Sequence, residues 1–246
     1  MYNLRYCCMF FALLLMYSVG SGQKKFISSG KIEFEKKVNV HAMLSNSIWD
    51  EQRKSTLPQF QSTFFDLYFT DSQTMYKSGR EVQVKYNQWG LQPTEDVLAT
   101  NLLTGKIAQR KHIFEDVYLI TEDLLKIKWK LTNETRTIAG FECKKATGIF
   151  NDSLYVFAFY TDEIIVPSGP ELFSGLPGLI LGVAFPRRHT TWFATKMELN
   201  PVSAQQLTPP TKGKKTDRAT LLPLIKKGMD GWDENSRQNV LYAAML

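Results

Sequence analysis

The sequence predicts a mainly β protein: a single antiparallel, strongly curved sheet (a half-barrel, barrel or sandwich) with a short helical or weakly ordered C-terminal tail. Three observations predict this class. Several segments alternate apolar and polar residues, which is typical of strands with one buried and one solvated face. One segment is apolar almost throughout, as a strand covered on both faces is. Helical spacing is concentrated after residue 208, and sheets of this kind commonly curl.

The predicted strands follow one another between residues 31 and 199. The first, KIEFEKKVNV, places isoleucine, phenylalanine and two valines on one side, and charged residues with an asparagine on the other. The clearest alternation is LKIKWKL, in which three lysines separate Ile127, Trp129 and Leu131. The almost wholly apolar segment is SLYVFAFYTDEI. The predicted strands cover residues 31–40, 63–72, 125–131, 137–150, 153–164 and 190–199.

Helical signals are fewer. Residues 45–55 predict a short helix capped by Ser45 or Asn46, ahead of Pro58. Helix-like spacing returns in residues 216–228, where Pro223 interrupts it, and in residues 232–246. The chain therefore divides into a signal peptide (1–22), an antiparallel β domain (23–208), and a basic linker with a helical or weakly ordered tail (209–246).

The first residues have the order of a secretory signal peptide. Arg5 is followed by an apolar run and then by Gly20, Ser21 and Gly22, which predicts cleavage between Gly22 and Gln23. The run is shorter than the roughly 20 residues that a transmembrane helix needs, so no span is expected after cleavage. A retained anchor helix is the alternative. We expect an exported protein of the periplasm or cell envelope, or a secreted one.

Composition restricts the partners. The chain has 246 residues and a net charge of +6, but its Lys and Arg are interleaved with Asp and Glu, so no nucleic-acid partner is predicted. Of three cysteines, Cys7 and Cys8 fall in the signal peptide. Cys143 alone cannot form an internal disulfide, and its strand-like surroundings predict a buried thiol.

No pattern of catalytic residues is visible. His41, His112 and His189 are isolated in the sequence and show no metal-ligand spacing. No Gly-x-Ser-x-Gly turn is present, and the acidic pairs are sequence neighbours, which point to opposite faces of a strand. We therefore predict no catalytic, cofactor-binding or metal-binding residue, no cofactor, and no enzymatic activity.

The stretch SGPELFSGLPGLILGV, residues 168–183, sets glycines and prolines directly against an apolar run. Glycine and proline allow a sharp turn, after which the aliphatic side chains enter the core. We interpret the stretch as a structural elbow ahead of a core strand; a ligand-contacting loop is the alternative. The structural motif consists of Gly175, Leu176, Pro177, Gly178, Leu179 and Ile180.

Three segments together resemble the GLPGLI family: IAGFECKKATGIF, FYTDEI and GPELFSGLPGLILGV. The resemblance implies an exported protein of a Gram-negative bacterium; it implies a compartment and a fold, and no reaction. Members often carry an Arg and a Trp in the segment that FNDSLYVFAFYT occupies here, and this chain has neither. A role for those two side chains is therefore not expected.

Three functions follow. The first is a non-enzymatic binding or carrier protein for an apolar small molecule or lipid, held on a curved sheet. Phe157, Phe159, Trp129 and Trp192 fit this function and fit an ordinary core equally well. The alternative is an envelope module that docks to another protein by a sheet edge or by the tail, with Trp232 exposed. A periplasmic hydrolase comes third. A carrier requires an apolar cavity, a docking module a filled core, and an enzyme converging polar groups.

Overall fold

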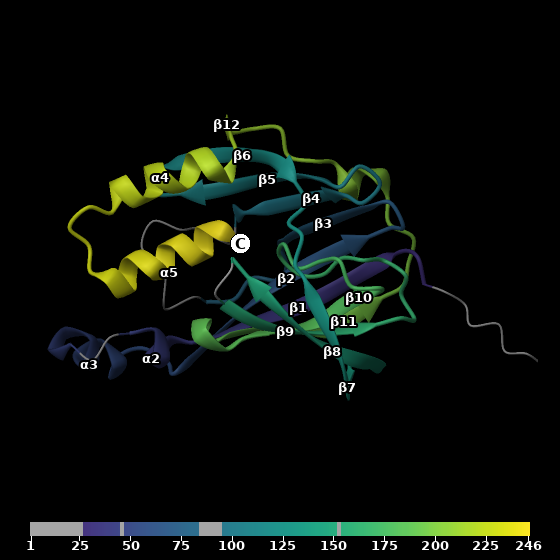
Figure 1. Ribbon diagram of the computed structural model, residues 1–246, viewed down its shortest axis with the longest axis horizontal. Coiled ribbons are helices and arrows are strands. Elements are labelled where there is room, and N and C mark those ends of the chain that lie inside the picture. The colour runs from purple at the N-terminus through teal and green to yellow at the C-terminus, as the bar shows by residue number, and fades with distance from the viewer. Residues whose placement is uncertain (1–26, 45–46, 84–94, 152–153) are drawn as a thin grey trace, which may run out of the picture.

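The computed structural model describes residues 27–44, 47–83, 95–151 and 154–246. The predicted signal peptide, with its cleavage site at Gly22 and Gln23, lies outside the described residues, as do Ser45 and Asn46. The predicted fold class is confirmed: the described chain forms a single, open, mostly antiparallel sheet of twelve strands, with helices near the C-terminus (Figure 1).

The strands run across the sheet in the order β12-β6-β5-β4-β3-β2-β1-β11-β10-β9-β8-β7. Neighbours are antiparallel except β12 and β6, which are parallel. The strands are β1 (Gly30–Asn39), β2 (Phe60–Phe69), β3 (Gln73–Ser78), β4 (Val97–Asn101), β5 (Lys106–Ile113), β6 (Asp116–Asp123), β7 (Trp129–Ile138), β8 (Phe141–Phe150), β9 (Leu154–Thr161), β10 (Leu179–Phe185), β11 (Thr190–Glu198) and β12 (Lys214–Thr216).

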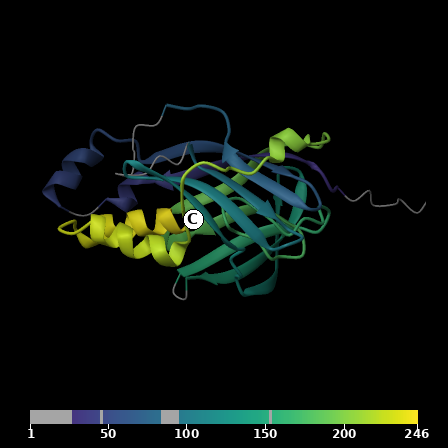
Figure 2. The same ribbon diagram turned by 90° about the horizontal axis from the view of Figure 1, so that it is seen from above.

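The sheet has an inner face, which encloses the core, and an outer face. It curves so strongly that residues from both of its halves enter one hydrophobic cluster (Figures 1 and 2). Ile32 and Phe34 of β1, Leu98 of β4 and Ala158 of β9 all belong to it and are almost fully buried. The alternation predicted for β1 therefore reports the inner and outer faces correctly.

Two predictions about strands differ from the structure. Residues 124–128 have no regular structure, and β7 begins only at Trp129. Alternation predicts which side chains face the core, and Ile127 does contact β8 at Gly148. A strand also needs a neighbouring strand as hydrogen-bonding partner, and the alternation does not predict one. In addition, β3 to β6 lie between residues 73 and 123, where no element was predicted.

The early helices project from one end of β1 and β2 (Figure 1). They are α2 (Val40–Met43) and α3 (Ile48–Lys54). The helix predicted for residues 45–55 is confirmed as α3, but its cap is Ser47, whose Oγ accepts a hydrogen bond from the Asp50 backbone N at 3.2 Å. Two short 3₁₀ helices, η2 (Pro186–Arg188) and η3 (Ala204–Leu207), flank β11.

The C-terminal segment is helical and packs on the sheet. Helices α4 (Arg218–Gly228) and α5 (Glu234–Met245) begin at the caps Asp217 and Asp233. Their apolar residues form a second cluster with β5 and β6: Ile113, Ile120, Leu221, Ile225, Met229, Val240 and Ala244. Strand β12 lies within the segment predicted as a basic linker, so that segment also contributes to the sheet.

Trp232 corrects the expectation of an exposed indole. It is half-buried and packs edge-to-face on Phe114, with ring centroids 6.2 Å apart. The apolar side of the tail packs against the sheet of the same chain, which sequence spacing alone does not reveal.

No helix within the described ranges is long and apolar enough to cross a bilayer.

The connection between β9 and β10, residues 162–178, crosses the inner face. Phe173 lies against Phe150, Phe185 and Trp192, with ring centroids 5.7–6.2 Å apart. Trp129 Nε1 donates a hydrogen bond to the Ser174 carbonyl O at 2.8 Å. This connection therefore fills the inside of the curved sheet between its two halves.

Cys143 on β8 is fully buried, as the sequence predicted, and burial raises the pKa of its thiol to about 12. In a variant with Cys7 and Cys8 replaced by serine, we expect Ellman's reagent to leave the native protein unlabelled at mildly alkaline pH, because the thiolate is the reacting form. The same reagent should label Cys143 once the protein is unfolded in urea. Equal labelling rates in both states would contradict the buried thiol.

Candidate functional site

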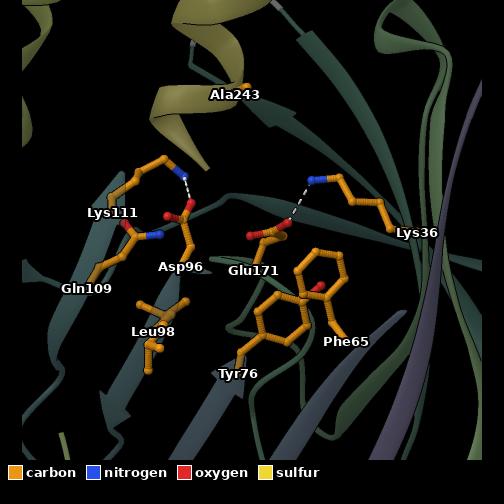
Figure 3. A pocket seen from close by; sticks show the side chains of 10 residues that line it. Lys36, Phe65, Tyr76, Asp96, Leu98, Gln109, Lys111, Glu171 and Ala243 are labelled. Carbon is orange, nitrogen blue, oxygen red and sulfur yellow. Dashed lines mark hydrogen bonds and ion pairs between the residues drawn. The ribbon is translucent and has the colours of Figure 1, made fainter. Parts of the chain in front are cut away.

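A polar pocket lies on the inner face, beneath the C-terminal part of α5 (Figure 3). Its volume is about 50 Å³. Strands β1 to β5, the connection 162–178 and α5 all contribute to its wall. The lining residues are Lys36, Phe65, Tyr76, Asp96, Val97, Leu98, Gln109, Lys111, Glu171 and Ala243.

The lysines and the glutamine reach the pocket because they occupy the apolar side of their strands. Lys36 follows Ile32 and Phe34 at spacings of two, and Gln109 and Lys111 lie between Ile107 and Ile113 in the same way. Gln109 and Lys111 are 2% and 4% exposed. Sequence analysis did not identify these residues, although polar residues that break an apolar alternation were a visible signal.

The first ion pair joins β1 to the connection 162–178. Lys36 Nζ lies 3.0 Å from Glu171 Oε1, and both side chains are mostly buried. The ammonium also lies over the rings of Phe65 and Trp192, at 5.7 and 5.1 Å from their centroids. Glu171 has φ +49°, a left-handed conformation that is uncommon outside glycine, so the fold holds this carboxylate in place at a conformational cost.

The second ion pair joins β5 to the start of β4. Lys111 Nζ lies 3.3 Å from Asp96 Oδ2, and Asp96 Oδ1 accepts a hydrogen bond from the His112 backbone N at 2.9 Å. His112 Nε2 lies 3.0 Å from Glu95 Oε2 outside the pocket wall. Figure 3 shows the carboxylates of Asp96 and Glu171 between the two lysines, both near the centre of the pocket.

The floor contains a buried phenol, that of Tyr76. Tyr76 stacks on Phe65, with ring centroids 5.1 Å apart and planes 13° apart. Its Oη is buried, and burial, followed by the negative charge of Glu171, raises the pKa of Tyr76 well above its ordinary value. Neither Tyr76 Oη nor Trp192 Nε1 has a hydrogen-bond partner of normal geometry among the described residues, and of the two only Tyr76 lines the pocket. A buried phenol without a hydrogen bond of normal geometry is rare in folded proteins and leaves bonding capacity for a ligand.

The roof is attached through a buried network. Gln109 Nε2 donates a hydrogen bond to the Leu246 carbonyl O at 3.0 Å. Arg218, at the start of α4, donates to Gln109 Oε1 and to both carboxylate oxygens of Glu122 on β6. Burial lowers the pKa of Arg218 to about 10, which leaves it protonated at neutral pH.

The aromatic residues proposed for ligand contact do not share a face. Trp192 stands opposite Lys36 and faces inward, and Trp129 lies against Gly148 on the same inner side. Phe157 and Phe159 alternate with the fully buried Ala158 and lie on the outer face. The pattern of an almost wholly apolar strand could not reveal this division.

The GLPGLI motif follows Glu171 in the chain and leads into β10. Its last two residues, Leu179 and Ile180, begin β10 and are fully buried. Gly175 has φ +88°, and Gly178 touches the backbone of Thr161 so closely that a Cβ would clash with the Thr161 carbonyl O. Among the residues that the structure describes, none of Gly175 to Ile180 lines the pocket, whereas Glu171 from the same stretch does.

The three histidines of the sequence lie on different elements of the fold. His41 lies on α2, His112 on β5 and His189 in the turn before β11. No group of three His, Cys, Asp or Glu side chains within the described ranges is arranged to hold a metal ion. The pocket instead combines ammonium and carboxylate groups, an amide and a phenol with aromatic walls. These groups can bind a small polar group by hydrogen bonds and pack its apolar part on a ring.

Two solved structures share the fold. They are two crystal forms of PNGF-II, in space groups C2 and P21, with 16% and 15% sequence identity and TM-scores of 0.54 and 0.55. Each alignment covers 82% of this chain but only 33% or 34% of the PNGF-II chain, so this chain spans about a third of that protein. No curated protein matches this chain in sequence.

The sequence model of one family matches residues 62–221, which is more than half of the chain. That family is described as the N-terminal domain of N-glycanase peptide. The resemblance to the GLPGLI family stays a prediction. On the extent of the match, the chain belongs to the family of N-glycanase peptide N-terminal domains.

Proposed function

We propose that this chain is a non-enzymatic binding module of an exported bacterial protein, and that its inner pocket binds the acetamido group of an N-acetylated glycan. The observation that carries the proposal is the pocket itself, where two mostly buried ion pairs and the buried phenol of Tyr76 surround a small cavity. Buried ion pairs are often no more stabilising than apolar side chains of similar volume. Their presence around a cavity therefore favours a role in binding.

The size and chemistry of the pocket agree with this ligand. A cavity of about 50 Å³ has room for a small group of a few non-hydrogen atoms, since roughly 10–15 Å³ is enough to hold one water. An acetamido group has four. Glu171 can accept from its N–H, Lys36 can donate to its carbonyl, and Phe65 can pack against its methyl group. The family is named for an N-glycanase, and N-linked glycans carry acetamido sugars.

The proposal keeps the binding class predicted from the sequence and changes the ligand. An apolar molecule or lipid would have to lie against the lysines and carboxylates of this pocket, which would lose hydration without replacement. Under the docking alternative, another protein would pair with the edge strand β7, whose residues are largely exposed. The tail is less suitable as a docking element, since its apolar residues already pack on β5 and β6.

The test compares N,N′-diacetylchitobiose with cellobiose, which has hydroxyl groups where chitobiose has acetamido groups. We expect calorimetry to detect chitobiose binding and cellobiose to bind at least about tenfold more weakly, a difference of about 1.4 kcal/mol. Glu171→Gln should weaken chitobiose binding by a similar factor, because a charge-assisted hydrogen bond is lost. Glu51→Gln, on the exposed helix α3, is the matched control and should bind as the wild type does.

Equal affinity for the two disaccharides, or no binding of either, would overturn the acetamido proposal. Binding of palmitate in the same assay would support the apolar carrier instead, if larger side chains on the inner face abolish that binding. Circular dichroism of Glu171→Gln separates a lost contact from lost folding.

A further inference from the structure

The outer face of the sheet carries a continuous patch of large apolar side chains. We define the outer aromatic patch as Ile149, Tyr155, Phe157, Phe159 and Phe193. Ile149 stands opposite Tyr155 across β8 and β9, and these two are 49% and 58% exposed. Phe157, Phe159 and Phe193 are half-buried, so the outer face presents a partly exposed apolar surface, on the side of the sheet away from the pocket.

The register aligns the rings across neighbouring strands. Phe159 and Phe193 both stand opposite Gly182 of β10, and their ring centroids are 6.2 Å apart. A Cβ at Gly182 would lie 2.6 Å from the Phe193 ring, so a larger residue at this position would displace that ring. Along β9, Tyr155, Phe157 and Phe159 follow at spacings of two residues, which separates successive rings by about 7 Å. The rings therefore form a regular surface and not a scatter of single exposed residues.

Two cations lie over these rings. Arg136 of β7 has its guanidinium carbon 4.7 Å from the Phe193 centroid and 5.8 Å from that of Phe159. Lys145 has its Nζ 4.9 Å from the Phe157 centroid and also pairs with Glu134. Arg136 is exposed and makes no ion pair with the residues that the structure describes. Its guanidinium is held by stacking and keeps its hydrogen-bond donors for an anion.

We infer that the outer aromatic patch binds an extended acidic glycan, whose sugar rings stack on the aromatic side chains and whose carboxylates pair with Arg136. The C–H faces of sugar rings are apolar and carry slight positive charge, which complements the negative face of an aromatic ring. A carboxylate matches the planar fork of a guanidinium with two parallel hydrogen bonds. This surface is separate from the acetamido pocket, so the two proposals fail or succeed independently.

Charge favours this partner over two others. Along β7 and β8, Glu134 and Glu142 are interleaved with Lys144 and Lys145, and a phosphate at every nucleotide would meet these carboxylates. An apolar protein surface would bury the charge of Arg136 without a partner, which is costly. Of the two cations over the patch, Lys145 already pairs with Glu134, so a glycan with carboxylates on some of its sugars would meet Arg136, for which no ion pair is found among the described residues.

The experiment titrates the full chain with trigalacturonate, and with galactotriose as the uncharged match. We expect trigalacturonate to bind, with an affinity that falls as salt rises, and galactotriose to bind at least about tenfold more weakly. Arg136→Gln should weaken trigalacturonate binding about tenfold, and Phe157→Ala should weaken both ligands through lost stacking. Arg53→Gln on α3 is the control and should leave binding unchanged.

Several results would overturn the inference. The inference is wrong if trigalacturonate does not bind the wild type, or if it binds Arg136→Gln as tightly as the wild type. Tighter binding of an oligothymidylate than of trigalacturonate would assign the patch to single-stranded nucleic acid. Because Arg136 and Phe157 are at least partly exposed, thermal unfolding of both variants should stay near that of the wild type, which separates binding from folding.

Discussion

Replacing Gly178 with alanine is expected to destabilise the folded state by about 3 kcal/mol or more, at the upper end of what overpacking costs. The new Cβ would clash with the Thr161 carbonyl O and lie 2.9 Å from its carbonyl carbon. Both are backbone atoms at the end of β9, so they cannot move aside as a flexible side chain can. Either β10 must leave β9, or the connection that carries Glu171 must shift.

Urea unfolding followed by circular dichroism measures this effect, and Gly175→Ala is the matched control within the same motif. Gly175 has φ +88°, but the atom nearest to a new Cβ would be Trp129 Nε1 at 3.9 Å. That variant should lose only the roughly 1–2 kcal/mol that the left-handed conformation costs a residue with a Cβ. A smaller loss for Gly178→Ala than for Gly175→Ala would show that the elbow is looser than the structure indicates.

The same pair of glycines shows what the sequence could establish about the motif. The composition of residues 168–183 indicates a sharp turn into buried residues, and β10 does begin at Leu179. The reason that each glycine is needed could not be predicted. Gly178 depends on the backbone at Thr161, which lies on another strand, and Gly175 depends on its own φ. Spacing reports a turn, and only tertiary structure reports what the turn touches.

The strands show a similar division. Alternation identifies β1 and β11 because each has one face on the core and one that is more exposed; it also identifies β2, although Asp66 on its polar side is buried and pairs with Lys31. It did not lead to the prediction of β5, where Gln109 and Lys111 interrupt the apolar side. These two residues line the pocket, so the position where the pattern weakens is also where the candidate site lies.

Glu171 was beyond sequence reasoning. It pairs with Lys36, from which it is separated by 135 positions, and it reaches the pocket only because the connection 162–178 crosses the inner face. The division of aromatic residues between the two faces was hidden for the same kind of reason. A strand that is apolar on both sides gives no period, so Phe157 and Phe159 could not be separated from the core residues around them.

Replacing Arg218 with methionine is expected to cost about 2–3 kcal/mol, the range for removing one partner from a mostly buried charge network. Arg218 and Glu122 have side chains that are 13% and 24% exposed, so Glu122 would recover part of its hydration. Gln109 Oε1 is more deeply buried and would lose its donor. The loss should loosen α4 and α5 from β5 and β6, because Arg218 is the polar link at the first turn of α4.

Urea unfolding gives the total effect, and hydrogen exchange shows where it acts. Amides of α4 and α5 should exchange faster, while those of β8 and β9 keep their order of protection, because the apolar contacts of the second cluster are the only ones weakened. Arg237→Met is the control: it removes an exposed pair in α5 and should change stability by less than about 0.5 kcal/mol. If Arg218→Met matches that control, the network does not hold the tail.

The double variant Arg218→Met with Glu122→Met decides whether the charges or the shape attach the tail. If the penalty of the single variant comes from the unpaired carboxylate, removing that carboxylate should restore at least half of the lost stability. Chitobiose binding by the double variant then reports the state of the pocket independently of stability, because Ala243 of α5 is part of the pocket wall. A variant that regains stability and still binds poorly would show that the position of α5, and not the stability of the fold, controls the pocket.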